Sequence, residues 1–357
     1  MRNGARPASA SEFFPAELSP FSHRRETLSP AELLFGFVED VKGRPPEDKE
    51  QAMALASRVR FSAALPAGEA KLLDAEVILK VLDTPKPPCP SLYFKSRENP
   101  NGEFIPKMKL DAERHEAQGR KFYLHQLSQR EPWKSTSREA NQEQQCRVHP
   151  VPAGQAFFFH VDFDNLSEAE LGLLAYALSP SERFLHKIGM GKGIGLGSVR
   201  LEPLALLEID RASRYTPEGL KSSRFHQARL GPNALARWPE VYPAEKQVVA
   251  ASPPAPAFSI LRDGYRNRMS HPIRQAIELV GDPSYVKAPV LPPLVQGQLQ
   301  KDPEAETFKW FVANETGLAD RPTDREIKPQ KQFLRPLAGR KDLPVFTQPE
   351  WRPRERR

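Results

Sequence analysis

The chain contains few cysteines and no long apolar run. Its 357 residues include two cysteines, Cys89 and Cys146, and neither stands in a CxxC or Cys/His spacing. The sequence therefore favours neither a disulfide framework nor a zinc site. No run of about 18 apolar residues is present, so no membrane-spanning helix is expected, and residues 1–20 lack the apolar core of a signal peptide. These absences predict a soluble protein of a reducing compartment with no membrane partner.

Proline, in contrast, is abundant. The 37 prolines are about twice the ordinary share, and each fixes its own φ angle and removes a backbone donor. We therefore expect short elements joined by stiff loops rather than long helices. Lysine and arginine number 52 against 45 acidic residues, which gives a net charge of +7 and suits a polyanionic partner.

The coarse pattern predicts an α+β fold. A first helix is expected from Ser29, whose hydroxyl forms a capping box with Glu32, and its apolar face continues to Val38. Strands are expected at 58–62, 76–82 and 119–125.

The strongest pattern lies in the middle of the chain. Apolar residues at every second position from 157 to 163 share one face of a predicted strand. A helix then begins at a capping box formed by Ser167 and Glu170. A glycine-rich loop at 189–197 and a strand at 198–209 follow. Strand, helix, loop and strand in this order form half of a ferredoxin-like or RRM-like unit.

These patterns divide the chain into three parts. Residues 1–28 are an irregular basic lead-in, and residues 29–210 form a ferredoxin-like domain with an insertion at about 86–150. Residues 211–357 form a Pro-rich, less regular extension that ends in a basic tail. One hypothesis for this extension is an architectural role in docking other proteins. Short helices are expected within it at 272–280 and near 307–313.

The stretch 186–199 carries the clearest chemical signal. Five glycines alternate with other residues between Gly189 and Gly197, and Lys187 and Lys192 accompany them. Glycines with positive φ let several backbone N–H groups point toward one anion. The competing interpretation is a tight turn that is needed only for packing.

The glycine spacing excludes two familiar nucleotide motifs. A P-loop requires Ser or Thr directly after its lysine, but Gly193 follows Lys192. A dinucleotide fingerprint requires glycine at position 194 or 196, where Ile194 and Leu196 stand. We therefore expect no nucleotide cofactor.

Several stretches resemble a known family. FHVDFDNLSEAELGLL at 159–174 and HKIGMGKGIGLGSV at 186–199 resemble the C-terminal signature of the RAMP superfamily of CRISPR-associated proteins. LLFGFV at 33–38, RVRFS at 58–62 and GRKFY at 119–123 are similar to stretches of the large RAMP proteins of type III systems. The resemblance extends over about half of the chain.

The resemblance implies a RAMP fold of the ferredoxin-like class, in which the glycine loop and the open sheet face guide RNA. It also implies a cytoplasmic, prokaryotic subunit of a type III effector ribonucleoprotein. Such a subunit holds guide RNA, aligns it with target RNA in antiviral defence, and contacts other effector subunits. Family members that cleave target RNA use an aspartate near an N-terminal strand. That position cannot be assigned in this sequence, so cleavage is not carried over.

The predicted RNA contacts gather on the glycine loop and on basic or aromatic residues elsewhere. Phe122 and Tyr123 are candidates for base stacking, with core packing as the alternative for one of them. Arg58 and Arg60 are candidates for phosphate contact, with ordinary surface charge as the alternative. The predicted RNA-binding residues are His186, Lys187, Gly189, Gly191, Lys192, Gly193, Gly195, Gly197, Ser198, Arg58, Arg60, Arg120, Lys121 and Tyr123.

An endoribonuclease is the alternative hypothesis. His186 is a candidate general base for RNA cleavage, and Asp162 and Asp164, beside His160, are candidate ligands for Mg²⁺. A hydrogen-bonding histidine and a solvated strand end are the favoured interpretations of the same residues. We therefore expect no cofactor, with Mg²⁺ required only if the protein cleaves RNA.

Overall fold

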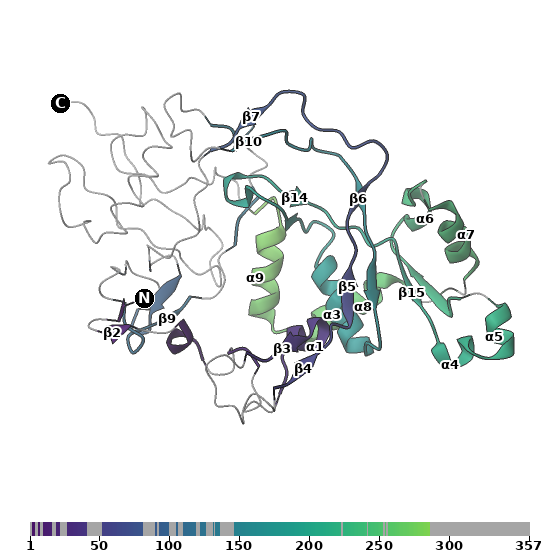
Figure 1. Cartoon of the computed structure of the whole chain (residues 1–357), viewed down its shortest axis with the longest axis horizontal. Coiled ribbons are helices and arrows are strands. Elements are labelled where there is room, and N and C mark those ends of the chain that lie inside the picture. Colours follow the sequence, from purple (N-terminus) through teal and green to yellow (C-terminus); the bar gives the residue numbers. More distant parts are fainter. Residues whose placement is uncertain are drawn as a thin grey trace.

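The computed structural model consists of helices and short antiparallel strand pairs, so the α+β class is confirmed (Figure 1). It describes residues 2–3, 6–7, 10–15, 19–21, 27–40, 52–80, 90, 93–99, 105, 110–118, 122–125, 131, 133–135, 146–222, 224–240, 242–252, 254 and 256–285. The strands are β1 (Arg2–Asn3), β2 (Arg6–Pro7), β3 (Phe37–Val38), β4 (Ala54–Leu55), β5 (Val59–Phe61), β6 (Leu65–Pro66), β7 (Val77–Ile78), β8 (Phe94–Ser96), β9 (His115–Ala117), β10 (Arg147–Val148), β11 (Phe157–Phe158), β12 (Val161–Phe163), β13 (His186–Lys187), β14 (Ser198–Val199), β15 (Ala205–Glu208) and β16 (Gln227–Leu230). The helices are η1 (Ala10–Phe13), α1 (Pro30–Phe35), α3 (Glu168–Leu178), η6 (Lys192–Ile194), α4 (Arg211–Arg214), α5 (Pro217–Lys221), α6 (Ala234–Arg237), α7 (Pro243–Ala251), α8 (Phe258–Arg268) and α9 (His271–Gly281).

Each sheet among the described residues consists of two antiparallel strands. In the ribbon that reaches the core, β5 pairs with β12, so that Val59 lies opposite Phe163. Farther along the same ribbon, β6 pairs with β11, and Leu65 lies opposite Phe158. The described strands thus form separate pairs rather than one larger sheet.

Helix α3 lies at the centre of the core. One side packs against α8, and another packs against α1 and β5, because its apolar residues recur at helical spacing. The cluster toward α8 contains Leu171, Ala175, Leu206, Phe258 and Leu261. The cluster toward α1 and β5 contains Leu34, Val59 and Leu174. The extension from residue 211, which the sequence predicts to be less regular, forms helices α4 to α9. Its helix α8 packs on α3, so the extension and α3 share one core.

Both predicted capping boxes are present. The Ser29 N–H donates to Glu32 at 2.7 Å and the Glu32 N–H donates to the Ser29 hydroxyl; Ser167 and Glu170 make the same pair of bonds at α3. The predicted length of the first helix is wrong, because α1 ends at Phe35. Gly36 takes a φ of 72°, which no helix continues, and the chain turns into β3.

Other predicted elements differ in extent. The strand expected at 119–125 is wrong for its described part, because Phe122–His125 forms no strand and contacts the glycine loop instead. The strand expected at 198–209 is divided into β14 and β15, with Pro203, which has no N–H to pair, between them. The helix expected at 272–280 is confirmed by α9, and the one near 307–313 lies outside the described residues.

Candidate nucleic-acid interface

The glycine loop, residues 188–197, joins the two strands of a short hairpin. Strands β13 and β14 pair so that His186 lies opposite Val199 and Lys187 lies opposite Ser198. The Ile188 N–H donates to the Gly197 carbonyl at 2.9 Å, which closes the base of the loop. Gly197 has a φ of 74°, and a Cβ there would lie 2.0 Å from the Ile188 carbonyl oxygen. Only glycine permits this close approach of the two strands.

Backbone donors are exposed at the outer part of the loop. Gly189 and Met190 are both exposed, and within the described part of the chain their N–H groups have no acceptor. Gly189 and Gly191 take φ values of 77° and 76°, and the Leu196 N–H turns inward to the Gly191 carbonyl at 3.1 Å. Such turns present N–H groups to an anion.

The two lysines of the loop differ in their surroundings. Lys187 is half-buried, and its Nζ donates to the carbonyls of Leu196 at 3.0 Å and Gly195 at 3.4 Å. Burial lowers the pKa of Lys187 to about 8. Lys192, at the start of η6, is partly exposed and makes no ion pair with any described residue. Lys187 therefore stabilises the loop through its hydrogen bonds, and Lys192 is the cation that the loop presents to solvent.

His186, the candidate general base, is held inside the fold. Its Nε2 lies 2.9 Å from the Leu178 carbonyl, and because a carbonyl oxygen only accepts, this nitrogen carries the proton. The ring of Phe184 packs edge-on against it, with centroids 4.8 Å apart. The geometry thus favours a hydrogen-bonding histidine at the end of α3 over a base aimed at RNA.

The structure brings the segment 122–125 against the glycine loop. A Cβ at Gly193 would lie 3.0 Å from Cε1 of Tyr123, so the tyrosine ring lies against this glycine. Phe122 is about half-exposed. The predicted partners Arg120 and Lys121 lie outside the described residues. Tyr123 therefore contacts the loop, and Phe122 is the more exposed of the two rings.

His125, whose role sequence reasoning missed, lies at the base of the loop. It is buried, and its Nδ1 lies 2.9 Å from the Ser198 hydroxyl while its Nε2 lies 3.1 Å from the Leu185 carbonyl. Ser198, a predicted RNA contact, therefore has an internal partner. No sequence pattern predicts this pair, because the two residues are 73 positions apart.

Arg58 makes its contacts inside the protein. Its guanidinium forms an ion pair with Glu170 and donates to the Asn165 carbonyl, and its Nε donates to the Leu33 carbonyl at 2.9 Å. The hydrogen bond from Arg58 lowers the pKa of the Glu170 carboxyl below its ordinary value. Arg58 thus joins α1, β5 and α3. Arg60, in contrast, is exposed.

The candidate metal ligands do not come together. Asp162 lies opposite Arg60 in the β5–β12 register, and Asp164 pairs with Arg211 at 2.7 Å. The neighbouring His160 ring packs edge-on against Tyr242. Among the residues that the structure describes, no group of three or more metal-ligating side chains is present.

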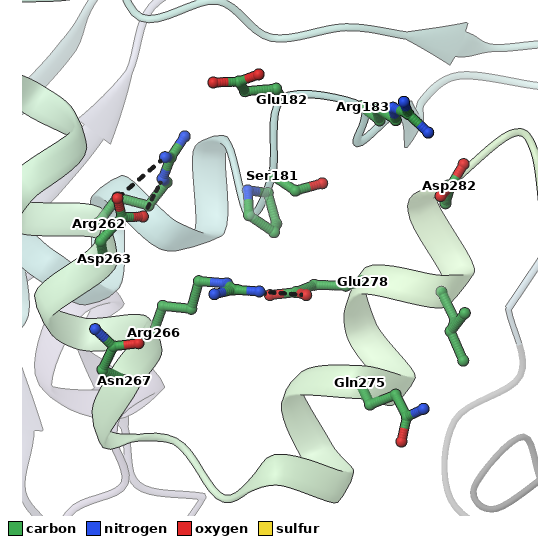
Figure 2. Close-up of a pocket in the computed structure, with 12 residues that line it drawn as sticks. Ser181, Glu182, Arg183, Arg262, Asp263, Arg266, Asn267, Gln275, Glu278 and Asp282 are labelled. Carbon is green, nitrogen blue, oxygen red and sulfur yellow. Dashed lines mark hydrogen bonds and ion pairs between the residues drawn. The ribbon is translucent and has the colours of Figure 1, made fainter.

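A separate pocket of about 640 Å³ lies between α8, α9 and the residues that follow α3 (Figure 2). A bidentate ion pair crosses it, with Arg266 Nε and Nη2 donating to Glu278 at 2.6 and 2.9 Å. Arg262 pairs with its neighbour Asp263. None of the predicted site residues lines this pocket. Since Arg262 and Arg266 already pair with carboxylates, we interpret the pocket as the place where α9 is fixed to α8.

No protein-family model matches the chain, and no curated protein matches it. Within the described residues, no helix combines the length and the apolar character that crossing a bilayer requires.

Proposed function

We propose that the chain is an RNA-binding subunit of a type III CRISPR ribonucleoprotein, built on a ferredoxin-like RAMP core, that holds guide RNA and aligns it with target RNA. The observation that carries the proposal is the glycine hairpin. It presents the backbone donors of Gly189 and Met190 and the cation of Lys192 to solvent, with the Tyr123 ring against Gly193. The resemblance of residues 159–199 to the RAMP signature supports the same assignment.

The chemistry of the hairpin suits an RNA of variable sequence. Backbone N–H groups and a lysine recognise phosphate oxygens, which position a strand and carry no base identity. Phe122 is exposed beside Tyr123 and is available to stack on any base. A guide RNA needs this kind of contact, because its sequence varies while its backbone does not.

An exposed aromatic face supports the assignment to a multi-subunit particle. Phe35 and Phe61 are 51% and 49% exposed, and their nearly parallel rings have centroids 6.3 Å apart. Phe159 extends the row, with its centroid 6.2 Å from that of Phe61. Contiguous exposed apolar rings are typical of surfaces that a partner covers, so we include other effector subunits in the proposal.

The test is the salt dependence of RNA binding by a Lys192→Ala variant. If Lys192 neutralises a phosphate, its loss weakens binding of single-stranded RNA and lowers the slope of log K against log salt by about 0.7. Fluorescence anisotropy with a labelled RNA measures both. Lys246→Ala is the matched control, because this lysine is also partly exposed and lies on α7, well away from β14 in Figure 1. An unchanged affinity and slope for Lys192→Ala would contradict the assignment of this loop.

A further inference from the structure

A single histidine joins the two sides of the glycine hairpin. His125 is 3% exposed, and its ring nitrogens reach Ser198 on β14 and Leu185 immediately before β13. The Leu185 carbonyl only accepts, so Nε2 is the protonated nitrogen. In a neutral ring Nδ1 is then the acceptor, and the Ser198 hydroxyl donates to it. The imidazole therefore fixes the spacing of both strands at the base of the loop.

The same segment also contacts the outer part of the hairpin. Two residues before His125, the Tyr123 ring lies against Gly193 in η6. Residues 123–125 therefore contact the hairpin at its base and at its turn, and the loop between these contacts has little freedom to shift.

The charged groups around His125 favour its neutral form. Lys187 lies opposite Ser198 in the β13–β14 register, and His186 is its neighbour on β13. Burial first, and then the charge of Lys187, lower the pKa of His125 below its ordinary value of 6.5. A proton added to Nδ1 would remove the acceptor for Ser198 and place a second buried cation beside Lys187.

We propose that His125 is a positioning residue, which sets the geometry of the glycine loop for RNA without touching the RNA. The inference rests on the proposed function, since the positioned groups are the exposed N–H groups and Lys192. It predicts that the loop loses its fixed shape when both hydrogen bonds of His125 are removed, while every cation of the interface remains.

The experiment compares His125→Ala, His125→Asn and His125→Gln with the wild type. Asparagine retains an acceptor for Ser198, and glutamine retains a donor for Leu185. His149→Ala is the matched control, because His149 also bonds a backbone carbonyl, that of Leu73, at an exposed site. Hydrogen exchange of the Ile188 and Leu196 amides reports loop order without RNA, and anisotropy reports RNA affinity and its salt slope.

We expect faster exchange of both amides in His125→Ala and RNA binding weaker by about 5- to 30-fold, the factor for two lost hydrogen bonds. The salt slope stays unchanged, because no phosphate-neutralising cation is removed. Asparagine and glutamine each restore part of the affinity. Wild-type affinity falls as the pH drops through the lowered pKa of His125, whereas His125→Asn, which has no imidazole, loses this dependence.

The outcomes separate the two proposals. If Lys192→Ala weakens binding and His125→Ala leaves affinity and amide exchange unchanged, the positioning role is wrong and the RNA site stands. If neither variant changes RNA affinity, the proposed function of the loop is wrong, and the inference falls with it. Should His125→Ala not fold, the Asn and Gln variants decide: an affinity and pH profile equal to wild type in both overturns the positioning role.

Discussion

At the scale of single residues, the proposed RNA interface depends on which positively charged side chains already have partners inside the protein. Arg58 and Lys187 both match the pattern of a phosphate contact in the sequence, yet each has a partner inside the protein. Arg60 and Lys192 remain available. In the proposed RNA interface, a positively charged side chain is therefore expected to contribute only where burial and carbonyl partners leave it accessible.

Arg58→Ala is expected to lower the free energy of unfolding by about 2 kcal/mol, because it removes charge-assisted hydrogen bonds to Glu170 and to two carbonyls. Urea denaturation followed by circular dichroism measures the change. Arg60→Ala, two positions along the chain from Arg58 and exposed, should change stability by no more than about 0.5 kcal/mol. Equal losses for the two variants would contradict the structural role of Arg58.

The same ion pair has a pH signature. Arg58 lowers the pKa of Glu170 from its ordinary 4.5, so the stabilisation by the carboxylate is complete above pH 4.5 and is lost as the pH falls through the lowered value. Acid unfolding of Arg58→Ala should therefore show a weaker pH dependence in that range than acid unfolding of the wild type. Parallel curves for the two proteins would argue against the coupling.

At the scale of elements, α8 joins the C-terminal region to the core. Phe258→Ala is expected to cost about 3–5 kcal/mol of stability, because it opens a cavity against Leu171 and Ala175 of α3. Ile260→Ala on the same helix is the control, since Ile260 is 59% exposed and its truncation should cost no more than about 0.5 kcal/mol. Thermal or urea unfolding distinguishes them. Similar small losses in both variants would mean that α8 does not belong to the cooperative unit of α3.

Local signals made some of these elements predictable. Each capping box lies within four consecutive residues, and both are present in the structure. The end of α1 was missed because the apolar spacing continues through Phe37, while the positive φ of Gly36 stops the helix. The two hydrogen bonds of His125 could not be predicted from the sequence, because its partners Ser198 and Leu185 lie 73 and 60 positions away. The packing of α8 on α3 was missed for the same reason.

At the scale of the whole molecule, the chain carries a net charge of +7, and the strands that the structure describes form separate two-stranded sheets. Strand pairs of two or three residues are marginal by themselves and gain stability from what packs on them. The α+β class was predicted from the sequence. The pairing of β5 with β12 and of β6 with β11 joins segments that are far apart in the sequence, so no local pattern predicts it.

Protein purified from its native host at moderate salt is expected to carry short RNAs. We expect a shared repeat-derived end and a variable remainder, because phosphate-directed contacts tolerate any base sequence. Extraction and sequencing of the bound nucleic acid measure this, together with the identity of copurifying proteins. Protein that carries neither RNA nor partner subunits would contradict the ribonucleoprotein assignment.

The ion pair between Arg58 and Glu170 also bears on the order in which the chain folds. Two groups share the Glu170 carboxylate: Ser167, three residues away, and Arg58, which precedes it by 112 positions. During synthesis Arg58 leaves the ribosome long before Glu170 does. The Arg58 side chain is therefore already outside the ribosome when the first turn of α3 emerges, so the ion pair with Glu170 needs no later segment of the chain.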